Sequence, residues 1–162
     1  MKLIGRANNH CELASIEPRA RADALAEFYA RYQGNALVID KWFAAQATSS
    51  RCDTLGAVRA LKDHPDFTLA NPNRVRALAG AFSMNQLHFH AADGAGYRFL
   101  ADVLLALDPI NPQTAAKLLP PLGRWKRFDA DRQALMRAEL ERILAAPSLS
   151  KDTYEQVSKS LG

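Results

Sequence analysis

The sequence predicts an all-α protein. Apolar residues recur at helical spacing along most of the chain, and residues that cap helices precede these segments. No run alternates between apolar and polar residues for long enough to form a strand. Asn-Pro pairs at Asn71 and Asn111 lie about 40 residues apart, within the period of helical-pair repeats. We therefore expect an armadillo- or HEAT-like right-handed α-solenoid of about eight helices in antiparallel pairs, rather than an up-down bundle.

Three helices are expected in the first part of the chain. The first spans residues 19–33, and Gly34 follows it, where a helix end favours a left-handed residue. Asn35 is expected to cap the second helix, and Asp53 the third, which Pro65 ends. Their predicted apolar residues are Ala22, Leu25, Phe28 or Tyr29, and Tyr32; then Leu37, Ile39, Trp42, Phe43 and Ala47; then Leu55, Val58 and Leu61.

The two Asn-Pro pairs each open a further helix. Asparagine supplies the capping oxygen, and proline occupies the first helical position, where its missing N–H would be unpaired in any case. Between these helices, Gly94 and Gly96 form a turn before an amphipathic helix over residues 97–107. The buried residues are expected to be Val75, Leu78 and Phe82, then Leu100, Val103, Leu104 and Leu107, then Ala115, Leu118 and Leu119.

Two more helices are expected at the end of the chain. Asp129 is predicted to cap the longer one and Ser150 the last. Helix pairs then begin near residues 19, 54, 96 and 129, at intervals of roughly 33 to 42 residues, which suits a repeat stack. The apolar residues of the two helices are Met136, Leu140, Ile143 and Leu144, then Tyr154, Val157 and Leu161.

The composition is that of one folded domain in a cytoplasmic protein. The chain has 162 residues, of which 48% are hydrophobic and 23% charged, enough for a sizeable core. The first residues lack the apolar run of a signal peptide, and the longest apolar stretch, 99–107, contains Asp102, so we expect no membrane contact. Cys11 and Cys52 match no zinc-ligand spacing, and a pair so far apart favours reduced thiols.

Residues of the types that bind metals gather between His88 and Asp93. His88, His90 and Asp93 could hold zinc, but a catalytic zinc needs three ligands and groups that orient them, and the His-Glu-x-x-His pattern is absent. In the favoured interpretation the histidines hydrogen-bond helix-end carbonyls, and Asp93 caps the next helix. No Gly-x-Ser-x-Gly or phosphate-binding loop occurs either. We therefore expect no metal ligand and no catalytic residue.

Basic residues outnumber acidic ones between Lys117 and Arg142, and the net charge is +4. Such a cluster can bind phosphates, but basic residues interleaved with acids more often form a solvated helix face. Trp125 is expected to pack between helices rather than to stack on a base. These features argue against nucleic acid as the partner.

Four stretches carry a family resemblance: NALVIDKWFAAQATS, NPNRVRALAGAF, FHAADGAGYRFLADVLLALDPINPQTAAKLLPPLGRWKRFDADRQ and LSKDTYEQVSKSL. They resemble the C-terminal end of the bacterial aminopeptidase N family, zinc-dependent enzymes that remove N-terminal residues from peptides. The resemblance runs from about Ala22 to the last residue and implies the second half of the C-terminal helical domain. Residues 1–18 are not placed by it, and residues 19–162 are predicted to form a single α-solenoid domain.

The resemblance also implies what this chain lacks. The family's catalytic domain, with its zinc helix, lies far upstream, so zinc belongs to the parent enzyme, and this chain has no cofactor and should be inactive alone. Its partners would be the upstream catalytic and helical domains of the same polypeptide. The family has Phe-His before an acid-Asp-Gly turn, where this chain has Phe89, His90 and, in place of the acid, Ala92. This favours a structural role for the histidines.

Some family members direct side chains of this domain toward bound peptide. The matching positions are Arg76, Gln113 and Lys117, so the resemblance implies that this chain closes the catalytic chamber and contacts substrate. Lys117 stands where relatives commonly have arginine, so it keeps a point charge but loses the bidentate fork. The alternative function is an independent helical-repeat scaffold that binds a protein or nucleic acid through its concave face.

Overall fold

The structure, a computed structural model, describes residues 18–162, and the elements in that part of the chain are all helical. The all-α prediction is confirmed. A π-helical turn, η1 (Arg76–Gly80), joins α5 to α6, and a 3-10 turn, η2 (Trp125–Arg127), precedes α11. The α-helices are α2 (Pro18–Tyr32), α3 (Ala36–Ala47), α4 (Thr54–Lys62), α5 (Pro72–Val75), α6 (Ala81–Ser83), α7 (Gln86–Phe89), α8 (Ala95–Leu107), α9 (Pro112–Leu118), α10 (Pro120–Gly123), α11 (Ala130–Leu144) and α12 (Lys151–Leu161).

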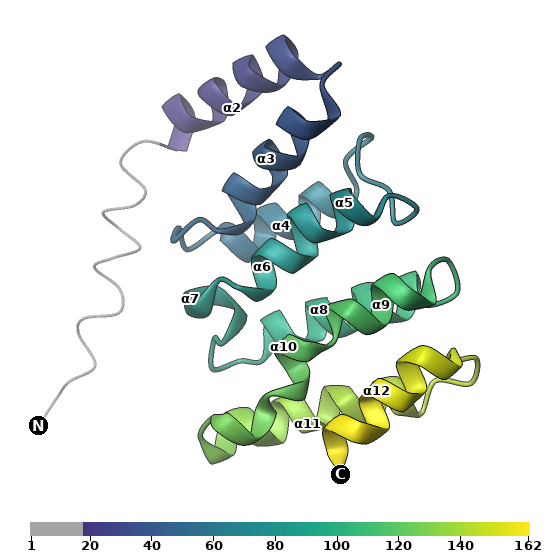
Figure 1. Cartoon of the computed structure of the whole chain (residues 1–162). Helices are drawn as coiled ribbons and strands as arrows, with labels where there is room; N and C mark the ends of the chain where they lie inside the picture. The colour runs from purple at the N-terminus through teal and green to yellow at the C-terminus, as the bar shows by residue number, and fades with distance from the viewer. Residues whose placement is uncertain (1–17) are drawn as a thin grey trace, which may run out of the picture.

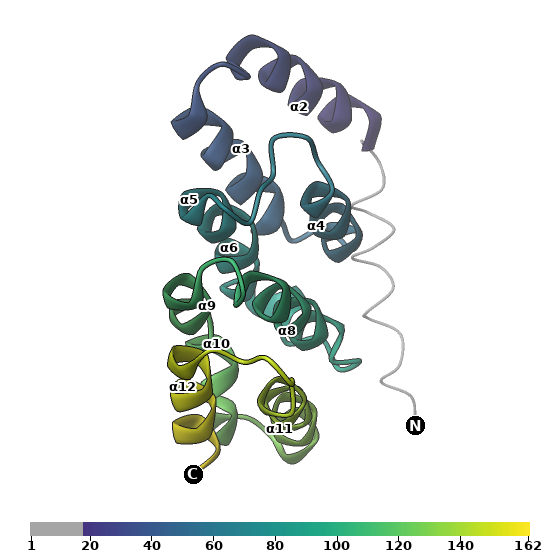
Figure 2. The ribbon, with the colours of Figure 1, turned by 90° about the vertical axis from the view of Figure 1, so that its right-hand side faces the viewer.

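The helices form successive antiparallel pairs that stack on one another (Figure 1). The pairs are α2 with α3, α4 with the continuous α5–η1–α6, α8 with α9, and α11 with α12. Figure 2 shows that α3, α5, α9 and α12 form one layer of the stack, and that α4, α8 and α11 form the other. Contacts between α3 and η1, between α8 and α11, and between α9 and α12 join neighbouring pairs within these layers. This arrangement is consistent with the predicted repeat stack.

Most of the predicted helix caps are present. Asn35, Asn71, Asn111, Asp129 and Ser150 each accept a hydrogen bond from a backbone N–H in the first turn that follows.

Two of the predicted helix-end features are wrong. Asp53 makes no capping bond, because its carboxylate faces Arg51, with Nε 3.1 Å from Oδ1. Gly34 is not left-handed, since Gly94, at a φ of 67°, is the only glycine of the described residues with positive φ.

The core contains the predicted apolar residues of the middle helices, and the errors lie at the two ends of the stack. Leu78, Phe82, Leu100 and Leu104 are fully buried. In contrast, Leu37 in α3 is 71% exposed and Tyr154 in α12 is 52% exposed. Both helices belong to terminal pairs of the described stack, so one side of each has no neighbouring repeat to cover it.

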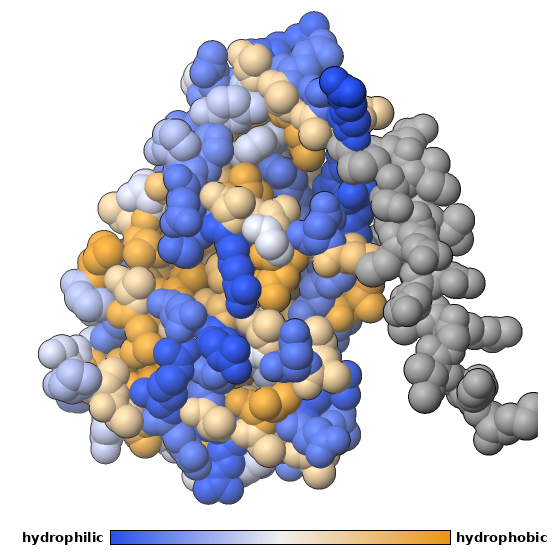
Figure 3. Space-filling model, turned by 180° about the vertical axis from the view of Figure 1, so that it is seen from behind, coloured by the Kyte–Doolittle hydropathy of each residue, from blue (hydrophilic) through white to orange (hydrophobic). Residues whose placement is uncertain are grey.

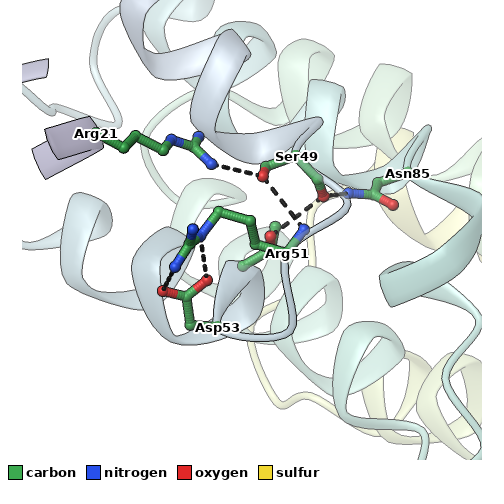
Figure 4. A network of polar contacts seen from close by, with 6 residues as sticks. Arg21, Ser49, Arg51, Asp53 and Asn85 are labelled. Atoms are coloured by element: carbon green, nitrogen blue, oxygen red, sulfur yellow. Dashed lines mark hydrogen bonds and ion pairs between the residues drawn. The ribbon is translucent and has the colours of Figure 1, made fainter. Parts of the chain in front are cut away.

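A polar network around Ser49 fixes the first pair of helices to the rest (Figure 4). The Ser49 hydroxyl accepts from Arg21 of α2 at 2.9 Å and from the Arg51 backbone N–H at 3.3 Å. The Ser49 carbonyl accepts from the Asn85 side chain, at the start of α7, at 2.8 Å. One serine in the α3–α4 connection therefore links three separate parts of the stack.

Two features bear on the predicted cytoplasmic location: membrane-spanning helices and the state of the cysteines. No helix in the described part is long and apolar enough to cross a membrane. The prediction of a reduced thiol is wrong for Cys52, which is disulfide-bonded, and Cys11 lies outside the described residues. The cytoplasmic location therefore loses the support of the thiols and stays a prediction.

Candidate functional site

The three candidate binding residues line one groove. Arg76 of η1 faces Gln113 and Lys117 of α9 across a hollow of about 310 Å³. All three side chains are exposed to solvent. The remaining lining residues are Pro72, Val75, Asn111, Thr114 and Leu118, so the groove has an apolar floor and a polar rim.

The local sequence explains why these side chains meet. The helices that begin after Asn71 and Asn111 start with the same Asn-Pro cap and lie in the same layer of the stack (Figure 2). Gln113 and Lys117 are four residues apart, so they project from one face of α9. Arg76 begins the π-helical turn, a type of distortion that is frequent at functional sites. The sequence pattern predicted the two helices, but it did not predict the π turn.

The two cations of the groove are not neutralised by ion pairs within residues 18–162. No ion pair among the described residues involves Arg76 or Lys117. The Arg76 guanidinium instead donates through Nη2 to the side-chain oxygen of Asn73. Asn73 is not among the predicted binding residues, although it lies three positions before Arg76 on the same helix. The groove therefore presents uncompensated positive charge.

Arg74, on the same helix, has a structural role instead. Its side chain is 8% exposed, and Nη1 lies 3.1 Å from Oδ1 of Asp40. The guanidinium also lies 5.0 Å from the ring centroid of Phe43 in α3. Arg74 is thus committed to the contact between α5 and α3, which belong to neighbouring helix pairs, whereas Arg76 remains available to a ligand.

A second hollow continues the groove toward the C-terminal helix. It has a volume of about 470 Å³ and shares Gln113 and Lys117 with the first. Asp152 and Glu155 of α12 line its far side. Lys117 therefore has Arg76 on one side and the acidic residues of α12 on the other. This arrangement depends on the packing of α9 against α12.

The His88–Asp93 stretch serves a helix junction. His90 Nδ1 lies 2.8 Å from the hydroxyl of Tyr97, and the imidazole stacks on Phe128 with ring centroids 4.2 Å apart. The expected hydrogen bond from the imidazole to a helix-end carbonyl is wrong for His90, because Nδ1 is engaged by the Tyr97 hydroxyl. The backbone carbonyl of His90 accepts from Arg132 Nε at 2.8 Å. Burial, with the nearby Arg132 charge, lowers the pKa of His90 and favours neutral imidazole. The residue at the N-cap of α8 is Gly94 and not Asp93 as predicted, although the Asp93 side chain, one position earlier, accepts from the backbone N–H of Ala95 at 3.0 Å.

These residues do not fit a zinc ion. Across residues 18–162, no three His, Cys, Asp or Glu side chains are grouped so that they could hold a metal. The Nδ1 of His90 is engaged by Tyr97, and Asp93 by the following helix.

The basic region between Lys117 and Arg142 is partly paired. Arg137 forms an ion pair with Glu141 at 2.8 Å, and Arg142 is 2.7 Å from both Glu139 and Asp102. Trp125 of η2 donates to the Ser160 carbonyl at 2.9 Å, so it packs against α12. The side of the molecule opposite to Figure 1 carries hydrophilic side chains over much of its surface (Figure 3). These observations fit a solvated face.

Comparisons with known proteins agree with the helical repeat. A family model described as "Domain of unknown function (DUF3458_C) ARM repeats" matches residues 10–162. The chain is 49% identical over 168 residues to Aminopeptidase N of Haemophilus influenzae, which covers 99% of this chain and 19% of that protein. It is 50% identical over 143 residues to Aminopeptidase N of Caulobacter vibrioides, covering 88% and 17% respectively.

A solved structure gives the same relationship. The crystal structure of Legionella pneumophila aminopeptidase A in complex with aspartic acid superposes with a TM-score of 0.85 and 35% sequence identity, over 93% of this chain and 18% of that chain. In the curated relatives the matching segment is the C-terminal part. This chain spans less than a fifth of the length of the relatives that it matches.

Proposed function

Because the chain belongs to the DUF3458_C family of ARM-repeat domains, we propose that it is the non-catalytic C-terminal part of a zinc-dependent aminopeptidase N, an enzyme that releases N-terminal amino acids from peptides. The main support is the identity of 49–50% to two such proteins over 88–99% of the chain. Zinc and the catalytic residues then belong to the rest of the polypeptide, and this segment helps to close the catalytic chamber.

The groove supplies the second part of the proposal, a contact with the peptide substrate. A peptide offers carbonyl oxygens and one terminal carboxylate, all of which accept hydrogen bonds. Arg76 and Lys117 bring unpaired positive charge, and the Gln113 amide can both donate and accept. Charge-assisted hydrogen bonds to such oxygens are roughly twice as strong as neutral ones. The groove is therefore suited to orient a peptide that enters the chamber.

The first pair of helices supplies a surface for the upstream domains of the same polypeptide. A hollow of about 450 Å³ between α2 and α3 is lined mainly by apolar side chains. Figure 1 shows α2 at the outer end of the stack. Each repeat of a solenoid buries the apolar face of its neighbour, so we expect preceding helices to cover this hollow. Its lining residues are Arg21, Ala24, Leu25, Phe28, Lys41, Trp42 and Ala45.

The substrate contact can be tested in the full-length polypeptide. Arg76→Ala and Lys117→Ala should each raise the activation free energy, measured from kcat/KM for peptides, by about 0.5–2 kcal/mol, the range for losing one exposed charge-assisted hydrogen bond. Zinc content should not change. Arg59→Ala and Lys159→Ala, which remove exposed cations outside the groove, are the matched controls. Equal kcat/KM in the groove variants and the controls would refute the contact.

A further inference from the structure

We propose that Asn73 is a positioning residue, which holds the Arg76 guanidinium at the groove without neutralising its charge. The inference rests on the proposed function, since it concerns how Arg76 meets an anionic or carbonyl oxygen of a peptide. Asn73 itself does not line the groove, whereas Arg76 does. Any influence of Asn73 on a ligand therefore passes through Arg76.

The backbone around Asn73 is held firmly. Its backbone N–H donates to the capping side chain of Asn71 at 3.0 Å, which fixes Asn73 in the first turn of α5. The two residues that follow, Arg74 and Val75, are both buried against the stack. From this position the Asn73 side-chain oxygen accepts from Nη2 of Arg76, one helical turn further on.

The choice of an amide at position 73 has a chemical consequence. The amide oxygen restrains one nitrogen of the guanidinium, and the other N–H donors stay available for a bidentate contact with a carboxylate. A carboxylate at the same position would compete with the ligand for the fork and cancel its charge. Asn73 therefore provides the orientation that an acidic residue would give, and it keeps the groove attractive to an oxygen anion.

The test uses the full-length polypeptide with Asn73→Asp, Asn73→Ala and Arg76→Ala. The probes are a tripeptide with a free C-terminal carboxylate and the same tripeptide as its C-terminal amide, each at low and high salt. Asn73→Asp should raise KM for the free acid by about 2- to 5-fold, because an exposed ion pair of ordinary strength must be broken. This effect should shrink at high salt and be smaller for the amide, and kcat should change little.

Asn73→Ala removes the restraint but adds no charge. It should raise KM for the free acid by about 2-fold, the effect of a weak exposed hydrogen bond, with little dependence on salt. Gln86→Asp, which adds the same charge on α7 outside the groove, is the matched control and should leave KM unchanged. A folding defect would affect both tripeptides equally and would not respond to salt.

The outcomes separate the two proposals. If Arg76→Ala raises KM but both Asn73 variants behave like the control, the positioning role is wrong and the substrate contact stands. If Arg76→Ala itself leaves KM unchanged for both tripeptides, the contact by Arg76 is wrong, and the role of Asn73 fails with it. Equal effects of Asn73→Asp on the acid and the amide, at both salt concentrations, would also overturn the positioning role.

Discussion

The carboxylate of Asp108 accepts two hydrogen bonds from Ser150, one from its backbone N–H at 2.7 Å and one from its hydroxyl at 2.6 Å, although 42 residues separate the pair. Thr153 Oγ1 donates to the same carboxylate at 2.5 Å. Asp108 follows α8 and Ser150 caps α12, so this contact joins the last two helix pairs. Burial acts to raise the pKa of Asp108, but the hydrogen bonds from Ser150 and Thr153 outweigh it and hold the pKa below the ordinary value.

We predict that Asp108→Asn lowers the free energy of unfolding of the isolated chain by about 1–3 kcal/mol at neutral pH, because buried donors lose a charged acceptor. The folded pKa lies below the unfolded one, so the stabilisation is present above pH of about 4 and is lost as the pH falls through the folded pKa. Urea unfolding at pH 7 and at pH 3 measures both effects. The difference between wild type and variant should narrow at the lower pH. The exposed Asp23→Asn is the control, and an equal loss there would remove the special role of Asp108.

A second prediction concerns the close approach of α8 to α7. A Cβ added at Gly96 would lie 2.5 Å from the carbonyl oxygen of Phe89, and the contact is with backbone, which cannot simply turn aside. Gly96→Ala should therefore destabilise the chain by about 1–3 kcal/mol. Gly56→Ala, in α4, is the matched control: nothing lies within 4 Å of its added Cβ, so it should stabilise by roughly 0.5–1 kcal/mol. Thermal unfolding of both variants decides the point, and a neutral Gly96→Ala would contradict the packing.

The third prediction concerns the uncovered end of the stack. Phe28 is 39% exposed and Leu37 is 71% exposed on the first pair of helices. The isolated chain should self-associate through them, and Phe28→Ser and Leu37→Ser should each shift the equilibrium toward monomer. Sedimentation velocity over a range of concentrations measures this. Leu87→Ser, at a residue 62% exposed on α7, is the control and should have less effect. A chain that stays monomeric at high concentration would count against covering of this end by upstream helices.

The fourth prediction is that the isolated chain hydrolyses no aminoacyl substrate, with or without added zinc. Activating water and polarising a carbonyl require a metal or an equivalent electrophile, and the described residues assemble no such group. A fluorogenic aminoacyl amide provides the assay. Turnover that purifies with the chain and disappears in His90→Ala would contradict the structural role of His90.

The parts of the fold that could be predicted depend on local chemistry. Asn71 and Asn111 indicate where their helices begin, because a capping oxygen accepts hydrogen bonds from backbone N–H groups in the first turn of the same helix. Asp53 fails the same rule since Arg51, two residues away, competes for its carboxylate. Exposure of Leu37 depends on what lies beyond the helix, which spacing within the helix cannot reveal.

The same difference between local and long-range contacts applies to the candidate site. The family resemblance selected Arg76, Gln113 and Lys117, and the matching caps of their two helices explain why these residues can face one groove. The acidic side chains of α12 near Lys117, and the contact of Asp108 with Ser150, join residues far apart in sequence. No local pattern records such pairings, so they appear only once the helices are packed.

The π-helical turn at Arg76–Gly80 fixes the length of its helix. Such a turn accommodates one more residue than an α-helical turn, and each residue turns an α-helix by about 100°. Deleting a single residue here would rotate the two halves of the helix relative to each other, so that Arg76 and the buried Phe82 could not both keep their directions. Gaps between related sequences should therefore fall in the loops on either side of residues 72–83, even though the first residue of the turn is exposed to solvent.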